Sequence, residues 1–245
     1  MAIGNYWECV LPEGAAAPPL QRIIEGTATL AREQFPSWRL NADRGDLGPA
    51  EFLCMGSPAG DMRAIAHLVK TSDDANFYLH SAFPWLAAGA PARLMVYGIR
   101  TDFFGIEGFI EAGINRRSVT FFDPLFALNK GKYRIGGEYD FILAAVSLDV
   151  RRTTPPEFDL MMDADPEASD HYRFRGYLHI SRTASFLDQP FEVFRTAVMR
   201  AGGGLLFVDI YVNSCRLDAG DALVSGATIT GMLWLQGCLA EEQKG

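Results

Sequence analysis

Three side chains in the N-terminal third are of types that bind zinc, and they are evenly spaced along the chain. Cys54, His67 and His80 lie thirteen positions apart, so neighbouring strands of a sheet can bring them together. A zinc site needs three or four ligands converging on one point, and specific zinc motifs contain closely spaced ligand pairs. The trio lacks such a pair and an evident fourth ligand. A metal site or hydrolase built on it is therefore an alternative hypothesis, beside structural Cys and His side chains.

No other motif predicts a catalytic residue. The stretch Gly56-Ser57-Pro58-Ala59-Gly60 resembles a nucleophile elbow, but its serine is misplaced for G-x-S-x-G and a proline follows it. The run Gly202-Gly203-Gly204 is not part of a phosphate-binding loop, because no G-x-x-x-x-G-K-[ST] pattern occurs in the chain. The sequence predicts neither a catalytic set nor a cofactor.

Basic and aromatic side chains interleave in two stretches, a pattern typical of proteins that bind single-stranded nucleic acid. The basic candidates are Arg100, Arg116, Arg117, Lys130, Lys132, Arg134, Arg173 and Arg175. The aromatic candidates are Tyr97, Phe103, Phe104, Phe109, Phe122, Tyr133, Tyr172, Phe174, Tyr177 and Phe194. Alternation in strands produces the same pattern when aromatic rings fill a barrel and arginines form its solvated face. The net charge of −8 also argues against a general nucleic-acid binder, although residues 91–134 and 172–216 each carry a net charge of +3.

The segments that must position these residues form two similar series. The run from Val119 to Asp123, followed by Gly136, has a weaker echo in the run from Leu205 to Asp209, followed by Gly226. The first series predicts strands over residues 93–100, 108–114, 118–123 and 138–148, with a helical turn within 124–132. The second series predicts strands over residues 172–181, 190–200, 205–213 and 227–239. Such self-similarity indicates two equivalent β units.

The predicted fold is α+β and mostly antiparallel β, with two small barrel units after a helix-containing region. We expect an N-terminal α+β region over residues 1–90, a first OB-like unit over 91–150, an acidic linker over 151–171 and a second OB-like unit over 172–240. The N-terminal region is predicted to contain a helix from Pro19 to Phe35 and strands from Ala64 to Val69 and from Asn76 to Phe83. Each unit shows four strands, whereas the OB-fold has five.

The C-terminal strand carries a pattern that resembles one protein group. Gly231-x-x-Trp234-Leu235-x-Gly237, preceded by Gly226, is similar to the closing strand of uncharacterised bacterial proteins with OB-like C-terminal domains. The resemblance covers residues 93–239 and implies a fold but no activity. Trp234 is predicted to anchor either the core or an interface.

Composition points to a folded, non-membrane protein. No apolar run approaches the roughly 20 residues that a membrane helix needs, and residues 1–12 lack a signal-peptide pattern, so we expect a cytoplasmic protein. The four cysteines are scattered and are expected to be buried free thiols. The leading hypothesis is a non-catalytic binding protein of the bacterial cytoplasm with a protein partner, self-association included. The alternatives are a single-stranded nucleic-acid-binding OB-like protein and, second, a hydrolase or metal enzyme.

Overall fold

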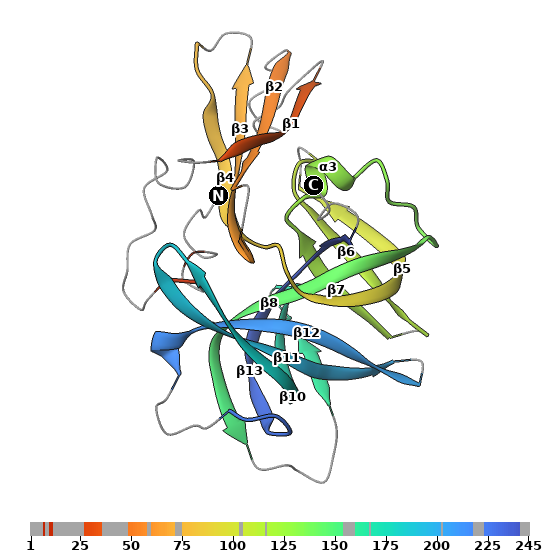
Figure 1. The fold of residues 1–245 in the computed structure, drawn as a ribbon. Helices are drawn as coiled ribbons and strands as arrows, with labels where there is room; N and C mark the ends of the chain where they lie inside the picture. Colours follow the sequence, from red (N-terminus) through yellow and green to blue (C-terminus); the bar gives the residue numbers. More distant parts are fainter. Residues whose placement is uncertain are drawn as a thin grey trace.

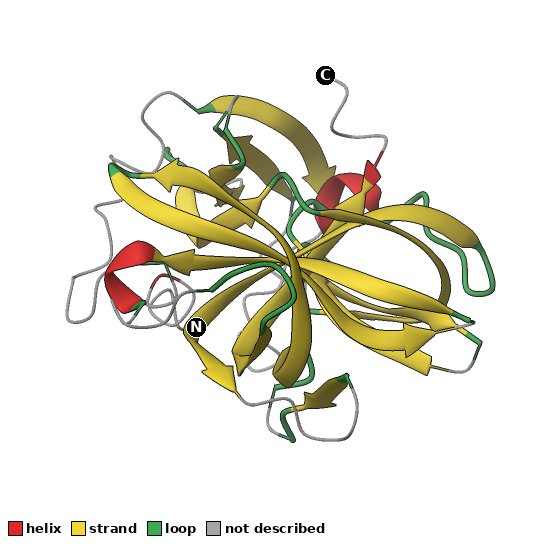
Figure 2. Ribbon diagram, turned by 60° about the horizontal axis from the view of Figure 1, so that its bottom comes forward, coloured by secondary structure: helices red, strands yellow, loops and turns green. Residues whose placement is uncertain are grey.

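The computed structural model describes most of the chain, and most of the described part is strand (Figure 2). The described residues are 7, 10–11, 27–35, 49–57, 60–71, 75–102, 105–115, 117–153, 160–166, 168–201, 203–217 and 223–240. They form a four-stranded antiparallel sheet and a nine-stranded sheet that closes on itself (Figure 1). No helix in these ranges is long and apolar enough to cross a membrane.

The N-terminal sheet has the strand order β1-β2-β3-β4. Its strands are β1 (Ala28–Phe35), β2 (Ala50–Gly56), β3 (Met62–Thr71) and β4 (Tyr78–Leu86). The helix predicted from Pro19 to Phe35 is wrong over residues 28–35, which form β1; residues 19–26 lie outside the described part. Antiparallel pairing with β2 along the whole of β1 outweighs a helical spacing of only a few apolar residues. The mostly β prediction is confirmed, whereas an α+β fold with an N-terminal helical region is not what the described residues form.

The larger sheet contains the strands predicted for both series. They are β5 (Ala90–Thr101), β6 (Gly108–Ile114), β7 (Arg117–Asp123), β8 (Glu138–Thr153), β9 (Met161–Ala164), β10 (His171–Phe186), β11 (Gln189–Ala201), β12 (Gly204–Asn213) and β13 (Thr228–Leu239). A helical turn, α3 (Phe126–Asn129), follows β7, and a short 3₁₀ helix, η1 (Ser214–Arg216), follows β12. The predicted linker over 151–171 contains the end of β8 and all of β9.

Eight of these strands close into a barrel, in the order β11-β12-β8-β5-β6-β7-β13-β10, because β10 also pairs with β11. The long strands β8 and β13 pair with each other as well, from Phe141–Leu239 to Thr153–Thr228. Their ladder divides the barrel into two rings of five strands that share both long strands. The first ring is β5-β6-β7-β13-β8, and the second ring is β10-β11-β12-β8-β13.

The two rings have the same connectivity. Each consists of a three-stranded meander, a long strand from its own series, and part of the long strand of the other series, which joins the meander in parallel as β7–β13 or β12–β8. Gly136 and Gly226 lie at equivalent positions: both have positive φ, and their N–H groups donate to Val96 and Leu178 respectively, each at 2.8 Å. Both acceptor residues lie at a bulge in the first strand of their ring.

The ladders correct one detail of the sequence comparison. In the first ring, Val96 at the bulge pairs with Ala112 of β6, which pairs with Val119 of β7. In the second ring, Leu178 at the bulge pairs with Thr196 of β11, which pairs with Val208 of β12. Asp209 directly follows Val208, whereas Asp123 lies four residues after Val119. The two aspartates matched in the sequence therefore occupy different positions, because apolar runs of strand residues align equally well in several registers.

The N-terminal sheet packs against both rings. Alternate residues of its strands face opposite sides, so Ala82 lies against the second ring and Phe83 against the first. The rings of Phe83 and Phe122 are 4.8 Å apart. The amide of Gln236 in β13 joins the edge strand β4 to the barrel: its Nε2 donates to the Pro84 carbonyl (2.8 Å), and its Oε1 accepts from the Leu86 N–H (3.0 Å). Side-chain hydrogen bonding thus replaces strand pairing at this edge.

Candidate functional site

The structure brings the predicted Cys and His residues into one buried polar cluster. Cys54 lies opposite His67 in the β2–β3 ladder, and His67 lies opposite Ser81 in the β3–β4 ladder. His67 Nδ1 is 3.1 Å from Ser81 Oγ and 4.0 Å from a carboxylate oxygen of Glu107, in the segment that joins β5 to β6. Next to it, His80 Nε2 lies 3.5 Å from the carboxylate of Asp102. The cluster therefore attaches the β5–β6 connection to the N-terminal sheet.

The electrostatics of this cluster do not produce an activated nucleophile. Burial raises the pKa of Cys54 to about 12 and lowers the pKa of His67 to about 3, so both groups are neutral at pH 7. A Cys–His pair in catalysis requires the opposite shifts. Ser81 and Glu107 also share the same ring nitrogen of His67, whereas a catalytic triad places the serine and the acid at different nitrogens. Across the described ranges, no group of three or more His, Cys, Asp and Glu side chains is arranged to hold a metal ion.

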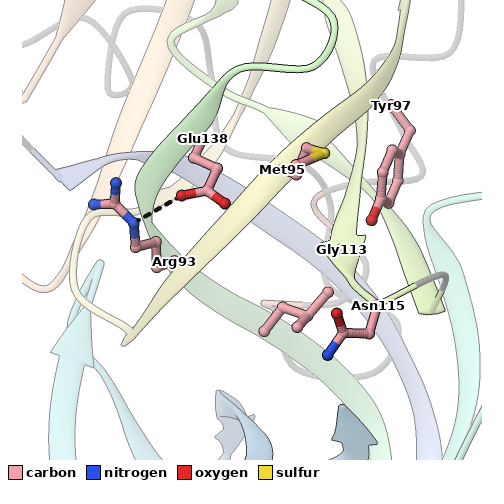
Figure 3. A pocket seen from close by; sticks show the side chains of 7 residues that line it. Arg93, Met95, Tyr97, Gly113, Asn115 and Glu138 are labelled. Atoms are coloured by element: carbon pink, nitrogen blue, oxygen red, sulfur yellow. Dashed lines mark hydrogen bonds and ion pairs between the residues drawn. The ribbon is translucent and has the colours of Figure 1, made fainter. Parts of the chain in front are cut away.

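A groove on the outer face of the first ring is the better candidate (Figure 3). It consists of two adjoining pockets of about 330 and 390 Å³ that share Arg93 and Glu138. The first pocket is lined by Arg93, Met95, Tyr97, Gly113, Ile114, Asn115 and Glu138. The second is lined by Arg93, Lys132, Glu138, Tyr139, Asp140 and Leu239. We call these residues together the first-ring groove.

Strand alternation and one glycine create this groove. Leu94 and Val96 of β5 point into the barrel and are buried, so Arg93, Met95 and Tyr97 point outward. Gly113 lies opposite Met95 in β6. A Cβ at this glycine would lie 1.9 Å from a backbone oxygen across the tight β6–β7 turn, so only glycine fits there. Gly113 and Met95 therefore line the first pocket together, with the turn backbone packed directly against Gly113.

The charges in the groove are accessible. The Arg93 guanidinium lies 3.3 Å from the Glu138 carboxylate and 3.4 Å from that of Asp140 (Figure 3 shows the first pair). All three side chains are more than half exposed, and such pairs contribute only about 0–1 kcal/mol to stability. A ligand can therefore replace them at low cost. Exposed Lys132, which lines the second pocket, adds a further positive charge.

The structure gathers only part of the basic set predicted to bind nucleic acid. Lys132 lines the second pocket, Arg117 lies opposite Ile114 of the first pocket in the β6–β7 ladder, and Arg134 lies two residues after Lys132 in the chain. The remaining basic side chains lie elsewhere. The Arg100 guanidinium lies 5.7 Å from the centre of the Phe109 ring and donates to Ser169 Oγ. Lys130 forms an ion pair with Glu33 at 2.8 Å. Arg173 and Arg175 lie on β10, and Arg116 is outside the described residues.

Most of the aromatic residues predicted to bind nucleic acid are buried, and so is Trp234. Phe122, Tyr133, Tyr172, Phe174 and Phe194 are buried, Phe109 is partly buried, and Tyr97 and Tyr177 are exposed on different rings; Phe103 and Phe104 lie outside the described residues. Trp234 is also buried, and its indole N–H donates to Asp170 at 2.7 Å. It packs in the layer between the first ring and the N-terminal sheet, so it anchors an internal contact of the chain.

No pattern in the sequence identifies several of the groove residues as part of a site. Arg93, Met95 and Glu138 alternate along strands like any solvated face, and only the pairing of β5 with β6 and β8 places them around one hollow. No protein-family model, no curated protein and no solved structure matches the chain. The site must therefore be interpreted from its own chemistry.

Proposed function

We propose that the chain is a non-catalytic binding protein of the bacterial cytoplasm, and that its first-ring groove takes an extended segment of a protein partner. The observation that carries this proposal is the make-up of the groove. Exposed Tyr97 and Arg93 and partly buried Met95 line it, and tyrosine, methionine and arginine are among the residues enriched at protein–protein contacts. Two adjoining hollows that share their central residues suit a segment lying across both. Small-molecule sites are instead single concave cavities.

The charge of the rim indicates the chemistry of that segment. Lys132 lines the groove, exposed Arg117 lies opposite its Ile114, and the Arg93 ion pairs can exchange for contacts with a ligand. A partner segment that carries acidic side chains beside a large apolar one complements this surface. Such a charge pattern raises the association rate and makes it sensitive to salt.

The finer description of the fold supports the same assignment. We interpret each ring as an OB-like barrel whose four own strands are completed by a fifth from the other series. In OB-folds, the face of strands two and three binds oligonucleotides. Here that face carries Phe122 in the first ring and Tyr211 in the second, and the N-terminal sheet packs over both. This packing disfavours single-stranded nucleic acid as the ligand and leaves the face with the first-ring groove available.

Affinity capture from the native cell with matched variants tests the proposal. The wild-type chain and the control variant Tyr78→Ala, at an exposed tyrosine outside the groove, should retain the same protein, whereas Tyr97→Ala combined with Arg117→Glu should lose it. Capture that is unchanged by the double variant contradicts the proposal, as does turnover of any substrate by the purified chain. Retention that disappears on nuclease treatment would replace the protein partner with nucleic acid.

A further inference from the structure

The short strand β9 covers an edge of the second ring, and the first ring has the same edge without such a strand. β9 pairs antiparallel with residues 172–175 of β10, just before β10 begins to pair with β11 at Tyr177. In the first ring, β5 begins to pair with β6 at Met95. Within the described ranges, no strand pairs with residues 90–94 of β5 on that side.

The ladders show that the two edges are equivalent. The bulges at Val96 of β5 and Leu178 of β10 fix the alignment of these strands, because each bonds to the glycine loop of its ring. Arg93 and Arg175 lie three residues before the bulges, and both pair with the residue four positions after the loop glycine. Residues 90–93 of β5 therefore correspond to the residues of β10 that β9 covers.

The edge of β5 offers backbone hydrogen-bonding groups to a further strand. The N–H and the carbonyl of Val96 bond to the Gly137 carbonyl and the Gly136 N–H, so they point toward β8. Backbone groups alternate sides along a strand, so the N–H and carbonyl of Arg93 and the carbonyl of Pro91 point away from β8. Pro91 is exposed, and a proline without an N–H is typical of a sheet edge. Such an edge is a template for strand pairing.

This edge lies beside the first-ring groove. Figure 3 shows Glu138 and Asn115 on opposite sides of β5, and Asn115 belongs to the turn at which β6 leaves β5. A strand along residues 90–93 would continue the line of β6. Every second side chain of that strand would lie on the outer face beside Arg93, and the others would lie on the inner face beside Ala92.

β9 shows which side chains suit such a strand. Its Met162 lies opposite Phe174 and packs against the core of the barrel. Its Asp163 lies on the outer face, opposite Arg173. In cross-strand pairs, opposite charges directly facing each other are stabilising. Since Arg93 carries the same charge on the outer face of β5, an apolar inner side chain and an acidic outer one complement this edge as well.

We infer that the partner segment binds as an added antiparallel strand on residues 90–93 of β5, with an apolar side chain facing inward and an acidic one facing Arg93. The inference rests on the proposed function, because this segment is the one that the first-ring groove takes. Main-chain hydrogen bonds to the edge supply affinity in this mode of recognition, and the side chains beside it supply selectivity.

A peptide with the sequence of β9 and its flanking residues, LMMDAD from residues 160–165 with both ends blocked, is the probe. In ¹H–¹⁵N NMR spectra of the full chain, it should shift the amide signals of Ala92, Arg93 and Leu94 with a dissociation constant below about 1 mM. In the free chain, the Arg93 N–H should exchange with water at least about tenfold faster than the Leu94 N–H, which points toward β8. Peptide at twice its dissociation constant should slow exchange of the Arg93 N–H about threefold.

Two variants separate the backbone of Arg93 from its side chain. Arg93→Ala and Arg93→Pro both remove the guanidinium, but only Arg93→Pro removes the N–H, and Pro91 shows that this edge accepts a proline. Arg93→Pro should bind the peptide at least about fivefold more weakly than Arg93→Ala, because one backbone hydrogen bond is lost. The exchange measurement on the wild type needs no variant, so it decides the question even if Arg93→Pro does not fold.

Four results overturn the inference: no binding of the peptide, equal affinities for the two variants, an Arg93 N–H already protected in the free chain, and shifts confined to β10, which would mean exchange with β9. None of them alters the expected loss of the captured partner by Tyr97→Ala with Arg117→Glu. A failure of strand addition is therefore distinguishable from a failure of the proposed function.

Discussion

Raising the pH through the range from about 4 to about 6 should destabilise the protein through a single carboxyl group, that of Asp123. This side chain is 1% exposed at the end of β7. It accepts hydrogen bonds from the Leu125 N–H (2.8 Å), the Tyr133 hydroxyl (2.6 Å) and Asn129 Nδ2 (3.2 Å). Burial raises the pKa of Asp123 from 3.8 to about 6, and the three donors offset only part of that effect.

The sign follows from proton binding in the two states. Between pH 3.8 and about 6, the folded protein keeps a proton on Asp123 that the unfolded chain has released. Unfolding therefore releases a proton, and the free energy of unfolding falls as the pH rises. The stabilising contribution of this proton is complete below pH 3.8 and is lost by about pH 6. A difference of about two pKa units corresponds to about 3 kcal/mol.

Urea denaturation of the wild type and Asp123→Asn between pH 4 and 8 measures this effect. Other carboxyl groups titrate in both proteins, so the difference between the two curves isolates Asp123. The variant should gain about 3 kcal/mol relative to the wild type as the pH rises. It should fold, because Asn129 Oδ1 is buried without a hydrogen-bond donor and can accept from the new amide after a flip. Parallel curves for the wild type and Asp123→Asn would refute the reasoning.

Three further predictions concern the ladder, the sheet contact and the thiols. Gly231→Ala should lower the free energy of unfolding by more than about 3 kcal/mol in urea denaturation, because its Cβ would lie 2.0 Å from a backbone oxygen of β8. Gly131→Ala, whose Cβ would have no atom within 4 Å, should leave the free energy of unfolding nearly unchanged. Similar losses for the two variants would contradict this packing. Gln236→Leu should lower the free energy of unfolding by about 2–3 kcal/mol, because it leaves two backbone groups of β4 without their hydrogen bonds. An unchanged melting temperature would argue against the link between sheet and barrel. Iodoacetamide at pH 8 should modify exposed Cys215 but not buried Cys54, as mass spectrometry of the native protein will show; early labelling of Cys54 would mean that the sheet opens.

The strands of the barrel are well predicted because their signal is local. Apolar alternation between turn residues predicts a strand over 108–114, which is β6, and a helical turn within 124–132, which contains α3. The same signal is present in β2, where buried Phe52 and Cys54 alternate with partly exposed neighbours, although no strand was predicted there. β1 is the opposite case, since a few apolar residues at helical spacing misled the prediction and the pairing with β2 decided the outcome.

The candidate sites are less accessible to sequence analysis because they depend on pairings between remote strands. Met95 has Gly113 on one side and Glu138 on the other only because β5 changes partners at this residue. Cys54 and His67 do become neighbours, as their spacing suggested, but burial determines their protonation states, and burial comes from Phe52 and Phe83, which flank the His67 ring at 5.3 and 5.2 Å. Residue types indicate the available chemistry, whereas the surroundings decide whether that chemistry is active.

The lengths of the two long strands explain why each series shows four strands where a five-stranded ring is needed. β8 and β13 contain 16 and 12 residues, which at about 3.3 Å per residue extends them beyond a single small ring. β8 pairs with β5 over its first residues and with β12 further along, while β13 pairs with β10 and then with β7. Ala145 and Leu235, at equivalent positions 90 residues apart, lie opposite each other where these partners change. Each series thus donates the end of its long strand to the other ring, so neither ring can close without both.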